Sequence, residues 1–325
     1  MKRREFIGLV GAAAFPARLT AQTRPSTALR VGLVSAILPR TAPMFAAFDR
    51  RLRELGYVEG QNFTFDFVNL NGETARFPEA AQELTRRGID ILVASGPELA
   101  LRAAVAATST LPIVMIAIDY DPFARGYVTS LSRPGRNVTG LFFRRLELAV
   151  KRIELVKEAF PDIQSATVFW DEISAPQWAA VQDPSISLSL RLQGAEFREK
   201  PFDYDRVLAA VPAESRRIVI VMMSPLFFPD RSRIAEVALR YRMGSMFGLR
   251  EYVEAGGLFS YGPSITRLFA RAAEIVDRIA RGAKPSDLPI EQPAVFEFVA
   301  NLKTARMLDL TIPPALLARA DQVIE

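Results

Sequence analysis

Short apolar runs alternate with stretches of helical periodicity along most of the chain. Residues 29–36, 89–94 and 113–118 are almost continuously apolar, which is typical of strands buried on both faces of a sheet. Residues 42–55 instead repeat apolar side chains at helical spacing and stop before Gly56, a common helix terminator. The alternation predicts a parallel sheet with helices on both faces.

The same strand–helix pattern starts again near residue 146. Expected strands are 63–68 in the first series and 165–170, 195–200, 217–223, 245–248 and 297–302 in the second. Expected helices are 78–87, 98–107, 146–160, 175–192, 204–210, 230–241, 264–281 and 316–324. Two series of similar length predict an α/β protein of two doubly wound parallel-sheet lobes joined by a multi-strand hinge.

The order of elements also predicts where the lobes divide. We expect residues 28–138 with about 262–290 to form lobe 1, because the long helix 264–281 can return to the first series. Residues 139–261 with about 291–325 then form lobe 2. The hinge is expected at Thr139-Gly140 and Tyr261-Gly262.

Residues 1–21 are typical of a signal peptide. Basic residues at positions 2 to 4 precede an apolar stretch from Gly8 to Phe15 that is too short to span a bilayer. Arg3-Arg4-x-Phe6-Ile7 favours a twin-arginine export signal, although paired arginines also occur in Sec leaders. Cleavage after Ala21 predicts a soluble periplasmic protein; the alternative is an amphipathic N-terminal helix of a cytosolic protein.

Charge indicates no nucleic-acid partner. The 325 residues carry a net charge of +5, but without residues 1–21 there remain 37 basic and 35 acidic residues, a net of +2. No basic run of the kind that follows phosphates occurs.

Composition removes most catalytic chemistry. The chain has no Cys and no His, which excludes thiol nucleophiles, disulfides, histidine bases and the commonest zinc ligands. It also lacks phosphate-loop, dinucleotide-binding and EF-hand spacings. We therefore expect no catalytic residues, metal or cofactor, and no enzyme; carboxylate chemistry by Asp119 and Asp121 stays open as an alternative.

Ligands of parallel α/β sheets bind beyond the carboxyl ends of strands, which selects candidate loops. In lobe 1 these hold Ser35, then Ser95-Gly96-Pro97, then Asp121. Free amides and the Ser95 hydroxyl could hold a carboxylate, unless the segment is an ordinary strand-to-helix turn. Asp121 could bind an ammonium group or cap its own loop.

In lobe 2 the same rule selects Trp170-Asp171 and Ser224. The Trp170 indole could stack on an apolar or aromatic ligand, or pack within the lobe.

Several segments, in order along nearly all of the chain that follows the expected signal peptide, resemble one known family. They are 55–62, 131–140, 251–262, 282–289, 301–305 and 320–325. In these the chain resembles the ABC transporter substrate-binding family often described as tryptophan/tyrosine-type, which has the periplasmic-binding-protein-like I fold.

This resemblance implies a monomeric receptor that closes two lobes around a small solute and delivers it to an ABC permease in the inner membrane. By position it implies ligand contact at Ser95, Gly96, Pro97, Asp121, Trp170, Asp171 and Ser224, with Thr139 and Tyr261 at the hinge. The family often has Thr-Pro-Ala at residues 96–98 and Asn at Asp171, so the ligand does not transfer with the resemblance. A sensory receptor feeding a membrane signalling protein is the alternative.

Overall fold

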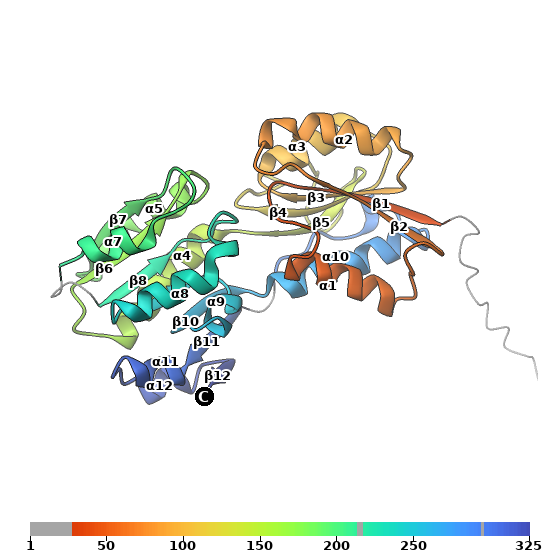
Figure 1. The fold of residues 1–325 in the computed structure, drawn as a ribbon. Coiled ribbons are helices and arrows are strands. Elements are labelled where there is room, and N and C mark those ends of the chain that lie inside the picture. The colour runs from red at the N-terminus through yellow and green to blue at the C-terminus, as the bar shows by residue number, and fades with distance from the viewer. Residues whose placement is uncertain (1–27, 213–216, 294–295) are drawn as a thin grey trace, which may run out of the picture.

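The structure is a computed structural model that describes residues 28–212, 217–293 and 296–325 as two α/β lobes lying side by side (Figure 1). Residues 1–27 contain the predicted export signal and its cleavage site, and they lie outside the described residues. Within the described part of the chain, no helix is long and apolar enough to cross a bilayer.

The first lobe is built on parallel strands in the order β2-β1-β3-β4-β5. They are β1 (Leu29–Ser35), β2 (Phe63–Asn69), β3 (Ile91–Gly96), β4 (Ile113–Ile118) and β5 (Val138–Phe143). Along β4, Ile113 and Met115 belong to one apolar core and Val114 and Ile116 to the other. Successive side chains of a strand point to opposite faces, so this sheet is buried on both sides, as its continuous apolar runs predict.

Helices cover both faces of this sheet. They are α1 (Pro43–Glu54), α2 (Phe77–Arg86), α3 (Glu98–Ala107) and the late helix α10 (Ile265–Ala280). Figure 1 shows α2 and α3 on one face and α1 and α10 on the other. Phe45 of α1 meets Phe269 of α10 edge-on, with ring centroids 5.3 Å apart. The late helix therefore does return to the first lobe.

The second lobe has the strand order β12-β11-β10-β9-β8-β6-β7. Its strands are β6 (Ser165–Trp170), β7 (Arg191–Glu196), β8 (Ile218–Val221), β9 (Gly244–Phe247), β10 (Phe259–Pro263), β11 (Phe296–Asn301) and β12 (Gln322–Ile324). All neighbours pair in parallel except β10 and β11. β11 runs the other way because the chain re-enters this sheet after its excursion through α10.

Helices of the second lobe also pack on both faces of its sheet. They are α4 (Arg145–Ala159), α5 (Ala175–Ala180), α6 (Gln182–Ser187), α7 (Tyr204–Ala210), α8 (Arg231–Arg240), α9 (Arg250–Glu254), α11 (Leu302–Met307) and α12 (Pro314–Leu317). Ile220 of β8 shares a core with Ile153 of α4, whereas its neighbour Val219 shares the other core with Ile234 of α8. Short 3-10 turns occupy Thr74–Arg76, Glu172–Ser174, Phe228–Asp230 and Pro285–Asp287.

The chain passes between the lobes after β5, after β10 and before β11. The predicted division at Thr139-Gly140 is wrong, because Thr139 pairs with Val114 inside the first sheet. The run from Val138 to Phe143 is apolar throughout and completes that sheet before the chain leaves it. Likewise β10 keeps Tyr261 and Gly262 in the second sheet.

The sequence analysis did not predict β5, β10, α9 and α11 as elements, and it placed three others differently. The expected strand 195–200 lies earlier, as β7, because it pairs along the whole length of β6. The expected helix 175–192 is two short helices, with Pro184 in the first turn of the second. The expected helix 316–324 ends at Leu317, and residues 322–324 pair with β11 instead.

Candidate ligand-binding cleft

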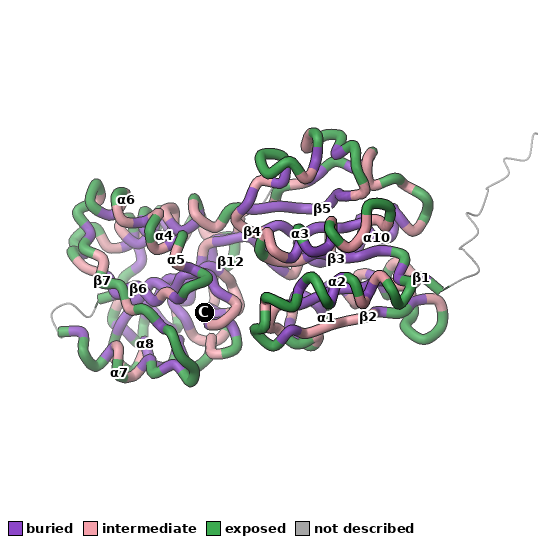
Figure 2. The backbone as a smooth tube through the Cα atoms, turned by 90° about the horizontal axis from the view of Figure 1, so that it is seen from above, coloured by how far each residue is buried: buried purple, intermediate pink, exposed green. Residues whose placement is uncertain are grey.

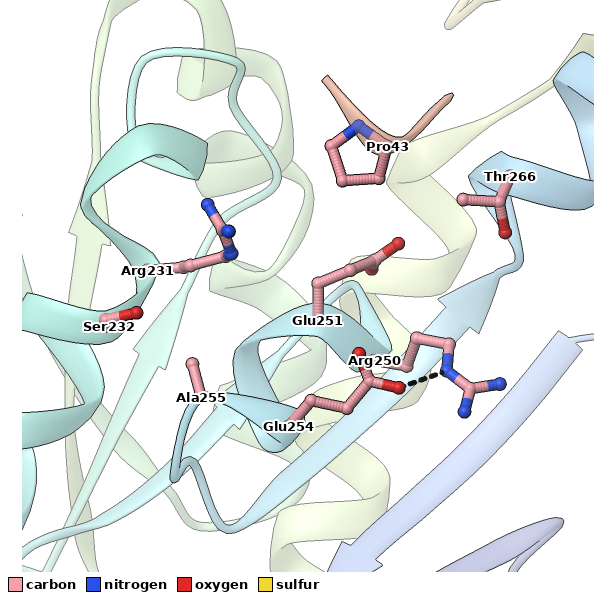
Figure 3. A pocket seen from close by; sticks show the side chains of 8 residues that line it. All are labelled: Pro43, Arg231, Ser232, Arg250, Glu251, Glu254, Ala255 and Thr266. Atoms are coloured by element: carbon pink, nitrogen blue, oxygen red, sulfur yellow. Dashed lines mark hydrogen bonds and ion pairs between the residues drawn. The ribbon is translucent and has the colours of Figure 1, made fainter. Parts of the chain in front are cut away.

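A cleft of about 490 Å³ lies between the two lobes, on the side where α8 and α9 begin (Figure 3). Its volume is in the range of small-molecule sites. Its lining comes from both lobes, and Figure 2 shows the lobes separated on either side of the connecting strands. The lining residues are Pro43 and Thr266 from the first lobe, and Arg231, Ser232, Arg250, Glu251, Glu254 and Ala255 from the second.

Helix starts position these side chains. Pro43 stands in the first turn of α1, where its missing amide hydrogen has no partner to lose. Arg231 opens α8 directly after the turn at Phe228–Asp230, and Glu251 stands in the first turn of α9. Because α8 and α9 follow the carboxyl ends of β8 and β9, they bring their first residues to the edge of the sheet where ligands bind.

Two of the charges in the cleft neutralise each other. Arg250 contacts Glu254 at 3.0 Å and Glu297 at 3.5 Å. Its guanidinium also donates to the Gln322 side chain, so it is engaged by groups of its own lobe.

The other two charges have no opposite charge in contact. The Arg231 guanidinium lies 4.9 Å from the Phe228 ring centre and donates to the Phe228 carbonyl at 3.2 Å. Within the described residues, no carboxylate lies within 4 Å of Arg231, and no Lys or Arg lies that close to Glu251. Burial raises the pKa of the Glu251 carboxyl, and the positive charges of Arg250 and Arg231 offset that effect only in part.

A polar network links the lobes where the chain first crosses. Asp119 follows β4 with a left-handed backbone (φ 66°), and its carboxylate accepts from the Arg145 side chain at 2.7 Å. Arg145, at the start of α4, also donates to the Met223 carbonyl at 2.7 Å. Asp119 thus binds an arginine of the other lobe, which gives it a structural partner in place of the acid–base role kept open above.

The network continues into a buried arginine. Arg152 is fully buried and donates to the Tyr261 carbonyl at 3.2 Å and to Gln177 at 3.3 Å. The Gln177 side chain in turn makes two hydrogen bonds to the backbone of Met223: it accepts from the Met223 amide and donates to the Met223 carbonyl. Burial, aided by the positive charge of Arg145, lowers the pKa of Arg152 to about 9.

The predicted ligand residues of the first lobe mostly bond their own loops. The Ser35 hydroxyl donates to the Leu38 carbonyl at 2.7 Å, and Asp121 accepts from the Phe123 amide at 2.8 Å. The Thr139 hydroxyl is buried and donates to the Leu288 carbonyl at 2.8 Å. The segment Ser95-Gly96-Pro97 ends β3 and precedes α3, and Pro97 makes no side-chain cap there. Of the first-lobe candidates, this last loop makes the fewest side-chain hydrogen bonds to the rest of the described chain.

The second-lobe candidates are similarly engaged. Trp170 stacks on Trp178 of α5, with ring centroids 6.1 Å apart and planes 9° from parallel. Asp171 forms a reciprocal cap with Ser174, although its Oδ2 atom is buried with no hydrogen-bond partner among the described residues. Ser224 accepts from the Leu226 amide at 3.1 Å. Tyr261 lies beside Phe296, with ring centroids 6.2 Å apart.

None of these predicted residues lines the cleft, and the residues that do line it were missed. The sequence prediction considered only the loops that directly follow strands. Arg231 and Glu251 lie in the helices that follow those loops. Extending the rule to the first turn of each following helix would have found both. Ligand contact by the predicted residues stays a prediction.

Comparison with known proteins identifies the family to which the chain belongs. A family model described as "ABC transporter substrate binding protein" matches residues 44–324, which confirms the resemblance noted in the sequence. A tyrosine-binding protein of Clostridioides difficile is 24% identical over 267 residues, covering 81% of this chain and 75% of the relative.

Solved structures show the same fold. A conserved domain protein of Vibrio cholerae superposes with a TM-score of 0.76 at 24% identity, covering 91% of this chain and 100% of that chain. An ABC domain from Streptococcus pneumonia in complex with L-Trp superposes with a TM-score of 0.74 at 23% identity. The match covers 92% of this chain and 100% of that chain.

Proposed function

The chain belongs to the ABC transporter substrate-binding family, a non-enzymatic component of transport, and we propose that it holds a small organic solute in the cleft between its lobes. The observation that carries the proposal is the cleft itself, a solute-sized space lined by both lobes at the carboxyl ends of their sheets. An amino-acid-like solute is favoured by the cleft charges and by the tyrosine and L-Trp named for two similar proteins.

Closure of the lobes is part of the proposal. The crossings at β5, β10 and β11 lie together, so the lobes can rotate about them without either sheet breaking. Rotation would carry Ser95-Gly96-Pro97 and Asp121 toward the second lobe, where Trp170, Asp171 and Ser224 stand at strand ends. These residues would then surround the solute, with Ser35, Thr139 and Tyr261 supporting the loops and hinge.

The proposal also includes export to the periplasm and a membrane partner. The charged and apolar pattern of residues 1–21 supports a signal peptide of the twin-arginine kind and a periplasmic location. The partner would be an ABC permease of the inner membrane that recognises the closed form, with the receptor acting as a monomer.

The test is a thermal-shift screen of residues 22–325, refolded from denaturant so that no solute is carried over. At a concentration one hundred times its Kd, a solute stabilises the folded state by about 2.7 kcal/mol, which raises Tm by about 5–10 °C in domains of this size. Mass spectrometry of solute retained by gently purified protein identifies the natural compound. A folded, solute-free protein that no small solute stabilises would contradict the proposal.

A further inference from the structure

The second lobe alone carries an uncompensated pair of opposite charges in the cleft. Arg231 and Glu251 are the cleft residues that lack an ionic partner among the described residues, whereas Arg250 and Glu254 are paired with each other. Figure 3 shows the Glu251 side chain reaching toward Pro43, with the Arg231 guanidinium beside it on the neighbouring helix α8.

The Arg231 guanidinium and the backbone at Glu251 are held in place before any solute arrives. The Arg231 guanidinium is fixed by the Phe228 carbonyl and by the ring of the same residue. Glu251 precedes Tyr252, whose buried ring stacks on Phe247 with centroids 4.6 Å apart. A preorganised guanidinium loses little side-chain entropy on binding, which favours affinity.

The first lobe adds no charge to this part of the cleft. It contributes Pro43 and the Thr266 hydroxyl side chain, which can cover a solute without changing the charge balance. A solute bearing one positive and one negative group would satisfy both charges. A neutral solute would leave both unpaired as the cleft closes, at the cost of burying isolated ions.

Building on the proposed function, we propose that Arg231 binds the carboxylate and Glu251 the ammonium group of a zwitterionic solute. The second lobe, through α8 and α9, then recognises the charged head, and the loops of the first lobe surround the remainder. This differs from the arrangement implied by family resemblance, in which the first-lobe loop Ser95–Glu98 holds the polar head.

Isothermal titration of residues 22–325 with the standard L-amino acids, L-tyrosine and L-tryptophan included, tests this assignment. We expect at least one to bind. Arg231→Gln and Glu251→Gln should each weaken it about 10- to 100-fold, the range for a lost hydrogen bond to a charged group. Arg233→Gln and Glu236→Gln remove the same charges from α8 outside the cleft lining and should leave the affinity unchanged.

Charge-deleted solutes separate recognition from a general loss of structure. Glu251→Gln should weaken the amine obtained by removing the carboxylate from the solute, but not the acid obtained by removing its amino group. Arg231→Gln should show the reverse.

The outcomes distinguish the two proposals. If a neutral solute such as a sugar binds instead, or if both cleft variants bind amino acids as the unaltered chain does, the charge assignment is wrong and the receptor function stands. If neither amino acids nor a wider solute library binds folded protein, both proposals fail.

Discussion

At the scale of single residues, the ionised Glu251 carboxylate destabilises the ligand-free protein, because its burial is only partly offset by nearby positive charges. Its carboxyl is desolvated, and the nearby arginines Arg231 and Arg250 offset this only in part, while Glu254 adds repulsion. Its pKa is therefore higher in the folded than in the unfolded state. Between those two pKa values the folded state binds more protons, so this group makes stability fall as pH rises.

Glu251→Gln should accordingly stabilise the ligand-free protein at pH 7 and leave it unchanged near pH 3, where the carboxyl is almost fully protonated in both states. We expect a gain on the order of 1 kcal/mol, or about 2–4 °C in Tm for domains of this size. Thermal unfolding of both proteins across this pH range measures it, with Glu236→Gln on the exposed face of α8 as the control. A destabilised variant at pH 7 would show that Glu251 has a structural role.

The polar residues at strand ends explain why the binding site was harder to predict than the fold. Asp121, Asp171 and Ser224 follow strands, as expected of ligand residues, but each bonds backbone amides of its own loop. A sequence cannot show whether such a side chain is already satisfied locally. Arg231 and Glu251 act together only because α8 and α9 pack side by side, a tertiary relation that periodicity does not reveal.

At the scale of elements, the close approach of β4 and β5 depends on one glycine. Gly140 has φ 136°, and a Cβ atom there would lie 2.0 Å from the Met115 carbonyl oxygen and 2.7 Å from its nitrogen. Both contacts are to backbone, so β5 would have to move away from β4. The same displacement would disturb the first crossing between the lobes.

Gly140→Ala should therefore lower the free energy of unfolding by about 3 kcal/mol or more, through strain and lost strand pairing. Gly126→Ala is the matched control, because Gly126 also has a positive φ (75°) but open space around the added carbon. It should cost about 1–2 kcal/mol. Urea unfolding compares them, and equal losses would mean that β5 adapts to the added carbon without cost.

The strands and helices themselves were predicted well where apolar runs were long. β1, β4 and β6 coincide closely with their predicted runs, because burial on both faces leaves a continuous apolar signal. β7 and β12 were misplaced because each lies at a sheet edge with exposed residues and little apolar pattern. The crossing after β5 was placed too early because strand membership depends on pairing with β4, which lies distant in sequence.

At the scale of the whole molecule, the interlobe contacts describe a hinge whose two sides are each rigid. Each sheet is buried on both faces, so neither can bend without opening a core. The contact between Asp119 and Arg145 lies at the first crossing, where a rotation moves atoms least. Solute binding should therefore change the angle between lobes and leave each lobe intact.

Small-angle X-ray scattering should then show a smaller radius of gyration for residues 22–325 when a binding amino acid is added at saturation, while far-UV circular dichroism stays constant. At ten times the Kd of the unaltered protein, about nine-tenths of the unaltered sites are filled, against about half of the sites weakened 10-fold and about one-tenth of those weakened 100-fold. Glu251→Gln should therefore contract by about half as much, or less, at that concentration. Arg233→Gln should contract like the unaltered protein. A radius that stays constant while calorimetry reports full occupancy would mean that the cleft binds its solute without closure, and recognition would then rest on the second lobe alone.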